Sequence, residues 1–205
     1  MIERTSLKEI NSLLDKNKNW KVLDIGCGYT AHEKAEYVAD VQDFSKFYQN
    51  KKKFIKIENK TLPFKDKEFD FVIASHVIEH VEDFGFFINE LERISNKGYI
   101  ELPTRLGDNL IFENTTDHIW WFVFDDNEKK LLATKREQTL EPFLSVATGR
   151  KLTESFRESL VLELIWKDKI NFCLDKSINN ITQKRISFLT IIKKYFSKRL
   201  RMLFS

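Results

Sequence analysis

The sequence has few cysteines and no long apolar run. These two features argue against a disulfide-rich protein and against a membrane-spanning one. Its two cysteines, Cys27 and Cys173, lie far apart and outside any metal-binding spacing. We therefore expect no disulfide framework and a reducing, cytoplasmic environment. The first residues lack the apolar stretch of a signal peptide. No uninterrupted apolar run approaches the length of a membrane span.

Acidic residues are missing from positions 176–205. Eight of the 34 basic residues lie there, which leaves 26 basic against 31 acidic residues in the rest of the chain. This distribution does not indicate a domain that binds nucleic acid. Apolar residues recur at helical spacing between the basic ones, so we expect residues 176–205 to form a basic amphipathic tail. Peripheral contact with the inner face of a membrane is expected; packing of the tail on its own domain or on a second subunit is the alternative.

Strand-length apolar runs alternate with helical segments through the first half of the chain. With 205 residues, 42% of them hydrophobic, the chain suffices for one domain with a full core. Helices are expected over residues 5–16 and 84–95. Strands are expected over Val22–Ile25, Tyr37–Val41, Phe54–Ile57, Phe69–Ala74, Tyr99–Leu102, Leu160–Trp166 and Lys169–Leu174. The alternation predicts an α/β fold: a Rossmann-like, doubly wound, mostly parallel seven-stranded sheet with an antiparallel final strand.

The second half of the chain departs from this alternation. Ile119–Phe124 and Leu131–Lys135 flank a polar turn and predict a small β-hairpin inserted after the fifth strand. A helix over Thr139–Thr148 is expected to end at Gly149. Leu160–Trp166 and Lys169–Leu174 are expected to pair with each other. We therefore expect one domain over residues 1–175, with residues 104–160 inserted above one edge of the sheet.

The most informative stretch is Val22–Thr30, in which a buried strand runs into Asp24 and then into Gly26 and Gly28. Glycine tolerates positive φ and carries no Cβ, so such a loop brings the backbone close to a ligand. In open α/β sheets, ligands lie beyond the carboxyl ends of the strands. Asp40 ends the second strand, where a carboxylate can accept hydrogen bonds from both hydroxyls of a ribose.

Further along, Leu62-Pro63-Phe64, a short polar turn and Phe69-Asp70 lead into the fourth strand, and Glu79-His80 follows it. Together with the glycine loop, these residues resemble the class I S-adenosylmethionine (SAM)-dependent methyltransferases, in particular those grouped as type 11. The resemblance covers residues 20–103 and continues more loosely to residue 175. It implies SAM as the cofactor and methyl transfer as the activity.

The resemblance also implies roles at the cofactor. The loop of Gly26, Cys27 and Gly28 would pass under the methionine and ribose parts of SAM. Asp24 would order this loop or meet the amino group of the cofactor. A Rossmann dehydrogenase is the alternative for a glycine turn of this kind, although the last glycine of Gly-x-Gly-x-x-Gly is missing.

Five other positions complete the implied cofactor site. Asp40 would bind the ribose, and Glu58 or the backbone at Asn59 would meet the adenine. Ser75 and His76, just past the fourth strand, would line the methyl-transfer end. The insertion over residues 104–160 would select the acceptor.

The run from His76 to His80 has two further interpretations. Its His-x-x-Glu-His pattern occurs in a class of metalloproteases, but there it lies on a continuous helix, whereas His76 closely follows a buried strand. Within a methyltransferase, an alternative set of metal ligands is His76, Glu79 and His80, with His118 as a further candidate. We favour the interpretation in which Glu79 and His80 cap and orient the loop beside the cofactor, without a metal.

His118 follows a long polar loop and precedes the expected hairpin. A histidine is suited to take a proton from an acceptor hydroxyl near neutral pH, so His118 is predicted to be catalytic, together with His76 and His80. The alternative is that this segment only packs a small subdomain.

The function predicted from these residues is SAM-dependent methyl transfer to a small-molecule, glycan or lipid-linked acceptor, achieved mainly by positioning. Two alternatives stay open. One is a module that binds SAM without catalysis, and the other is a membrane-surface module in which the tail matters most.

Overall fold

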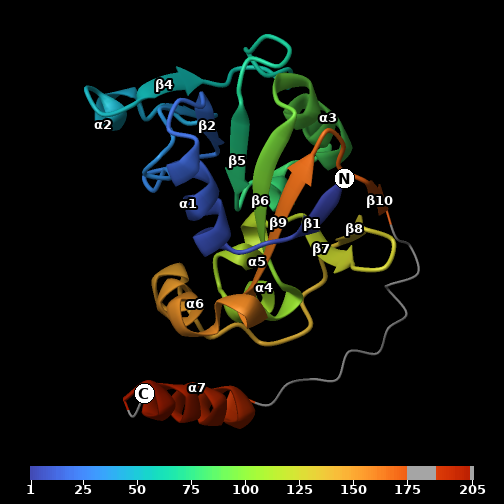
Figure 1. Ribbon diagram of the computed structural model, residues 1–205. Helices are drawn as coiled ribbons and strands as arrows, with labels where there is room; N and C mark the ends of the chain where they lie inside the picture. Colours follow the sequence, from blue (N-terminus) through green and yellow to red (C-terminus); the bar gives the residue numbers. More distant parts are fainter. Residues whose placement is uncertain (175–187, 204–205) are drawn as a thin grey trace.

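The computed structural model describes residues 1–174 and 188–203. A seven-stranded sheet in the order β1-β9-β6-β5-β2-β3-β4 forms its centre (Figure 1). The bounds of its strands are Ile2–Arg4 (β1), Val22–Ile25 (β2), Tyr37–Asp40 (β3), Lys53–Lys56 (β4), Phe71–Ser75 (β5), Lys97–Pro103 (β6) and Val161–Lys167 (β9). All neighbouring strands from β6 to β4 are parallel, and β9 is antiparallel to both β6 and β1. The expected α/β sheet is confirmed.

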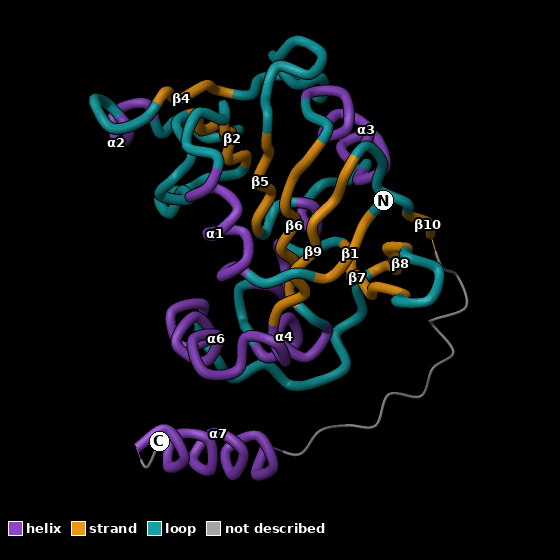
Figure 2. The backbone as a smooth tube through the Cα atoms, in the orientation of Figure 1, coloured by secondary structure: helices purple, strands orange, loops and turns teal. Residues whose placement is uncertain are grey.

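Two helices cover the two faces of this sheet (Figure 2). α1 (Leu7–Lys16) begins at Ser6, whose side chain accepts from the backbone of Glu9 in a capping box. Its buried residues Ile10 and Leu14 pack against strand residues such as Phe71. α3 (Phe84–Ile94) packs on the opposite face, against the alternate residues of the same strands.

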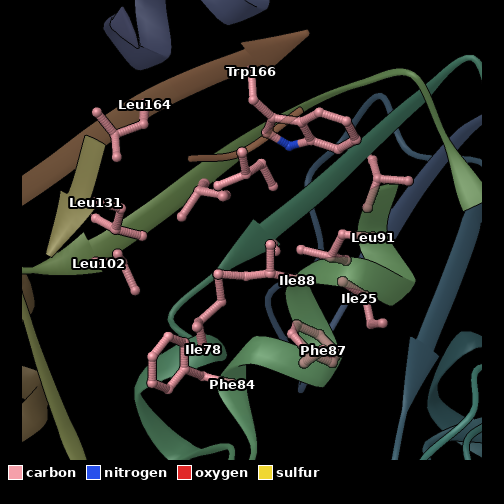
Figure 3. Packing of buried hydrophobic residues seen from close by; sticks show 14 of the residues in the cluster. Ile25, Ile78, Phe84, Phe87, Ile88, Leu91, Leu102, Leu131, Leu164 and Trp166 are labelled. Atoms are coloured by element: carbon pink, nitrogen blue, oxygen red, sulfur yellow. The ribbon is translucent and has the colours of Figure 1, made fainter. Parts of the chain in front are cut away.

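The larger part of the core lies on the α3 side (Figure 3). Phe84, Phe87, Ile88 and Leu91 of α3 contact this cluster, and all four are buried. Strands buried on both faces read as continuous apolar runs, which is why β5 was recognisable from sequence.

A second, three-stranded sheet has the order β10-β8-β7. β7 (Trp120–Asp125) and β8 (Lys130–Lys135) are antiparallel, so the expected hairpin is confirmed. β10 (Phe172–Leu174) pairs in parallel with β8 and not with β9. The prediction that Leu160–Trp166 and Lys169–Leu174 pair with each other was therefore wrong.

The seventh strand of the central sheet is β1, which the sequence analysis did not predict. Its three residues are too few to show a period, and they become a strand by pairing with β9. The predicted helix over Thr139–Thr148 was also wrong. α6 (Val146–Leu160) begins only after Ser145, whose side chain accepts from Thr148, and Gly149 lies in its first turn.

The segments that connect the parallel strands contain fewer helical residues than a doubly wound fold usually has. Between β2 and β3, and between β4 and β5, the described residues form loops and turns, and α2 (Ser45–Tyr48) is a single turn. Direct loops therefore bring the ends of β2, β3 and β5 to one edge of the sheet.

The tail contains α7 (Phe188–Leu203), which confirms a helix there; the first part of the tail, 176–187, lies outside the described residues. The ring of Tyr195 lies 5.8 Å from that of Phe156 in α6, measured between centroids. Leu189, Phe196 and Leu200 are exposed. Among the described helices, none combines the length and apolar character needed to cross a membrane.

Gly98 marks the closest packing in the sheet. A Cβ at this position would lie 2.4 Å from the carbonyl oxygen of Val72 and 2.6 Å from Nε1 of Trp166. We expect Gly98→Ala to lower the free energy of unfolding by about 1–3 kcal/mol or more, because backbone or indole must move. Denaturant titration measures the loss. Val123→Ala, at an exposed position of β7, is the control, and an equal effect of the two substitutions would contradict this account.

Candidate functional site

A cavity of about 530 Å³ lies at the carboxyl edge of the parallel strands. The loop after β2 and the ends of β5 and β6 form one side of it. α4 (Arg105–Leu110), α5 (Asn114–Asp117) and α6 cover the other side. The volume is in the range of small-molecule sites, about 300–1,000 Å³. The lining residues that carry the chemistry are Asp24, Gly28, Ser75, His76, His80, Glu101, His118 and Arg157.

The two glycines of the loop have different tasks, although both have positive φ, +71° at Gly26 and +47° at Gly28. A Cβ on Gly26 would lie 2.3 Å from Cγ2 of Val77, so this position is needed for the packing of two loops. A Cβ on Gly28 would meet no described atom within 4 Å, and Gly28 lines the cavity. Gly28 therefore leaves room for a ligand against the backbone.

Asp24 is buried and lines the cavity. Its Oδ2 accepts the backbone N–H of His32 at 2.6 Å. Burial raises the pKa of Asp24 to about 7, and the hydrogen bond from His32 opposes this shift only in part. Near neutral pH, a cation placed beside Asp24 would therefore favour its ionised form.

Asp40 supports the glycine loop from behind. Its Oδ2 accepts the N–H of Gly28 and its Oδ1 the N–H of Gln42, both at 2.9 Å. Asp40 is buried and is not among the residues that line the cavity. Its carboxylate keeps further lone pairs, so the predicted role at a ribose stays a prediction.

The other predicted cofactor residues divide into two pairs. Cys27 and Ser75 line the cavity, and burial raises the pKa of the Cys27 thiol to about 12. Glu58 and Asn59 are exposed and do not line it; Glu58 lies 3.6 Å from Nζ of Lys56. The structure thus does not bring the predicted adenine contacts together with the cavity.

His76 lies between two carboxylates. Its Nδ1 is 3.2 Å from Oε1 of Glu79 and its Nε2 is 3.1 Å from Oε1 of Glu101. The side chain of His76 is 44% exposed, and its partial burial alone would lower its pKa; the hydrogen bonds to Glu101 and Glu79 outweigh this effect and raise the pKa to about 10. His76 is therefore an imidazolium at neutral pH and a hydrogen-bond donor, not a base.

Glu101 connects this imidazolium to a second cation. It accepts from the hydroxyl of Tyr99 at 2.6 Å and forms an ion pair with Arg157 of α6. Burial would raise the pKa of Glu101, but His76, Tyr99 and Arg157 together lower it to about 2. Glu101 thus stays ionised and holds α6 against the sheet.

Two further histidines, His80 and His118, lie next to each other at the cavity. The centroids of their rings are 4.5 Å apart. Nδ1 of His80 lies 2.9 Å from the carbonyl oxygen of Asp117. Nδ1 of His118 donates a hydrogen bond to Asp108, which is fully buried. Asp108 also accepts from Nε1 of Trp121 at 2.6 Å and from Nε of Arg136 at 2.6 Å.

The comparison with protein families decides the class of the central segment. Residues 23–100 match the family described as a methyltransferase domain. This segment is a methyltransferase domain. The resemblance to the SAM-dependent class is confirmed over these residues, and SAM is the cofactor of that class.

Relatives of the methyltransferase domain include uncharacterized protein MJ0638 of Methanocaldococcus jannaschii, which is 36% identical over 121 residues. These residues are 52% of this chain and 51% of that protein, so the chain spans about half the length of the curated relative it matches.

Two solved structures resemble the fold. PH0226 protein from Pyrococcus horikoshii OT3 has a TM-score of 0.46 at 18% identity, over 80% of this chain and 89% of its own. A SAM-dependent methyltransferase from Thermotoga maritima, described as a possible histamine N-methyltransferase, has a TM-score of 0.45 at 15% identity, over 73% and 83%. Both scores are below 0.5, so neither likeness supports a statement about activity.

Three charged residues in or beside the cavity were not predicted. Glu101 lies near the end of a buried strand, as Asp24 and Asp40 do, and this position was a usable signal. Asp108 and Arg157 lie on helices without a local signal, because their partners come from segments distant in the sequence.

Asp24 makes the stability of the apo domain depend on pH. Its folded-state pKa of about 7 lies above its ordinary value of 3.8, so between these values the native state binds more protons than the unfolded state. Stability from this group is therefore lost as the pH rises from about 4 to 7.

We expect Asp24→Asn, which cannot ionise, to gain stability relative to the native protein over this range, by up to about 4 kcal/mol. Denaturant titrations of both proteins at pH 4.5 and 7.5 measure the difference. A difference that stays constant between the two pH values would show that burial does not shift this group.

Proposed function

We propose that the whole chain is a SAM-dependent methyltransferase that acts on a small-molecule, glycan or lipid-linked acceptor. The observation that carries this proposal is the composition of the cavity wall. The glycine loop of the methyltransferase domain lines the cavity beside Ser75 and His76, and His80 and His118 line it as well. A cofactor bound on the loop would thus present its reactive end to a polar wall.

The residues on the cofactor side fit SAM. The open space at Gly28 admits a ligand against the backbone, and Asp40 holds the N–H of that residue. Asp24 offers a buried carboxyl to a cationic group. The sulfonium of bound SAM supplies a reactive methyl group, so the task of the protein is to align the acceptor and to exclude water.

The residues on the acceptor side can hold and deprotonate a hydroxyl. His76 donates hydrogen bonds as an imidazolium. Since the carboxylate of Asp108 can only accept, His118 donates from Nδ1 and keeps a lone pair on Nε2. We propose that His118 assists removal of the acceptor proton, with Nε2 as the basic atom.

The position of α7 supports a lipid-linked acceptor. α7 touches α6 through Tyr195, and α6 contributes Arg150, Thr153 and Arg157 to the cavity wall. The exposed apolar residues of α7 alternate with basic ones, which suits the surface of an anionic membrane. A cytoplasmic protein peripheral to the inner face of a membrane is part of this proposal.

SAM binding should depend on the space at Gly28. We expect Gly28→Val to abolish binding, because the new side chain would enter the cavity. Isothermal calorimetry with SAM measures the affinity. Tyr29→Phe, an exposed position of the same loop, is the matched control and should bind normally. Unchanged affinity of folded Gly28→Val would remove the cofactor assignment.

Turnover should depend on His118. We expect His118→Ala to lower methyl transfer by about a hundredfold or more, while SAM affinity stays intact. Transfer of labelled methyl groups from SAM to a metabolite extract provides the assay. His32→Ala is the control, because His32 bonds to Asn11 and does not line the cavity. Wild-type turnover in His118→Ala would refute the role.

A further inference from the structure

Glu79, His80 and His118 converge at the side of the cavity. Glu79 and His80 lie on the 3₁₀ turn η1 (Ile78–His80), and His118 lies between α5 and β7. One oxygen of Glu79 and one ring nitrogen of each histidine lie within 4.8 Å of one another. The N–H of Ile119 donates to the carbonyl oxygen of Glu79 at 2.8 Å, which fixes the two segments side by side.

Glu79 carries an unsatisfied oxygen in this cluster. Its side chain is fully buried, and Oε1 faces Nδ1 of His76. Oε2 is buried and has no hydrogen-bond partner among the described residues. Leaving a buried polar atom unpaired destabilises the folded state, and more strongly for a charged group. A cation at this oxygen would remove that destabilisation.

Both histidines have the tautomer that a metal ligand needs. Nδ1 of His80 faces the carbonyl oxygen of Asp117, and Nδ1 of His118 faces the carboxylate of Asp108. Because both partners can only accept, each Nδ1 carries a proton, and the neutral ring of each histidine has its lone pair on Nε2. A carboxylate or carbonyl behind a ligating histidine is the usual outer partner at metal sites.

We propose that Glu79, His80 and His118 bind one divalent transition-metal ion of the zinc class. Two imidazoles and one carboxylate are a known set for such ions, with bonds of about 2.0–2.2 Å, and they leave at least one position open. The hard ions Mg²⁺ and Ca²⁺ prefer sites made of oxygen alone. The geometry revises our expectation of a metal-free loop and excludes His76 from the set, because both of its ring nitrogens face carboxylates.

The open position faces the cavity, because His80 and His118 line it. It would take water or an acceptor oxygen, whose pKa the ion lowers. With an ion present, His118 therefore assists deprotonation through the ion, not by direct proton transfer. This last step rests on the proposed function, whereas binding of the ion does not.

The test is binding of Zn²⁺ to the purified full chain after treatment with a chelator. We expect one ion per chain in competition with a chromogenic chelator, and a thermal midpoint that rises with Zn²⁺. His80→Ala, at an exposed position, and the isosteric Glu79→Gln should each weaken binding by about a hundredfold or more, beyond the 10–100-fold typical of outer partners.

His32→Ala is the matched control, a histidine outside the cluster, and should bind Zn²⁺ as the native chain does. The midpoints of all variants without metal report folding. SAM binding, measured separately, tests the proposed function, so each proposal can fail alone. Absence of stoichiometric Zn²⁺ binding, or unchanged affinity in folded His80→Ala, would overturn the metal site.

Discussion

The close contact between Gly26 and Val77 is the constraint on which the site depends. Parallel pairing of β2 with β5 places the loops that follow both strands next to each other. Only a residue without a side chain at position 26 allows them to touch, since a Cβ there would lie 2.3 Å from Val77. The glycine loop and the segment that carries His76 and His80 thereby form one continuous wall of the cavity.

Several carboxylates in and behind that wall are buried. Most of them are paired with side chains from other segments of the chain. Glu101 is paired with His76 and Arg157, and Asp108 with His118 and Arg136. A buried charge without a partner is strongly destabilising, so these pairs hold distant segments in register. Glu79 differs, since one of its oxygens has no described partner. That difference separates a structural carboxylate from one suited to a ligand.

The two proposals divide the cavity into two halves with separate tasks. The glycine loop and Asp24 belong to the methyltransferase domain matched over residues 23–100. The acceptor half combines the turn after β5 with the segment around His118, which lies outside that match. Glu79 and His80 lie within residues 23–100 and His118 lies outside them, so the proposed metal site joins residues of the matched domain to one that the match does not include.

Local patterns determined much of the fold. The buried runs of β2 and β5, the glycine loop and the hairpin of β7 and β8 could be predicted from the sequence, because their signals lie between near neighbours in the chain. Tertiary structure alone decided the pairing of β1 with β9 and of β10 with β8. It also decided that Gly26 is needed for packing while Gly28 faces the open cavity, and that Asp108 contacts His118. Each of these features depends on contacts between segments that are distant in the sequence. A local sequence pattern does not show which distant segments pack against each other.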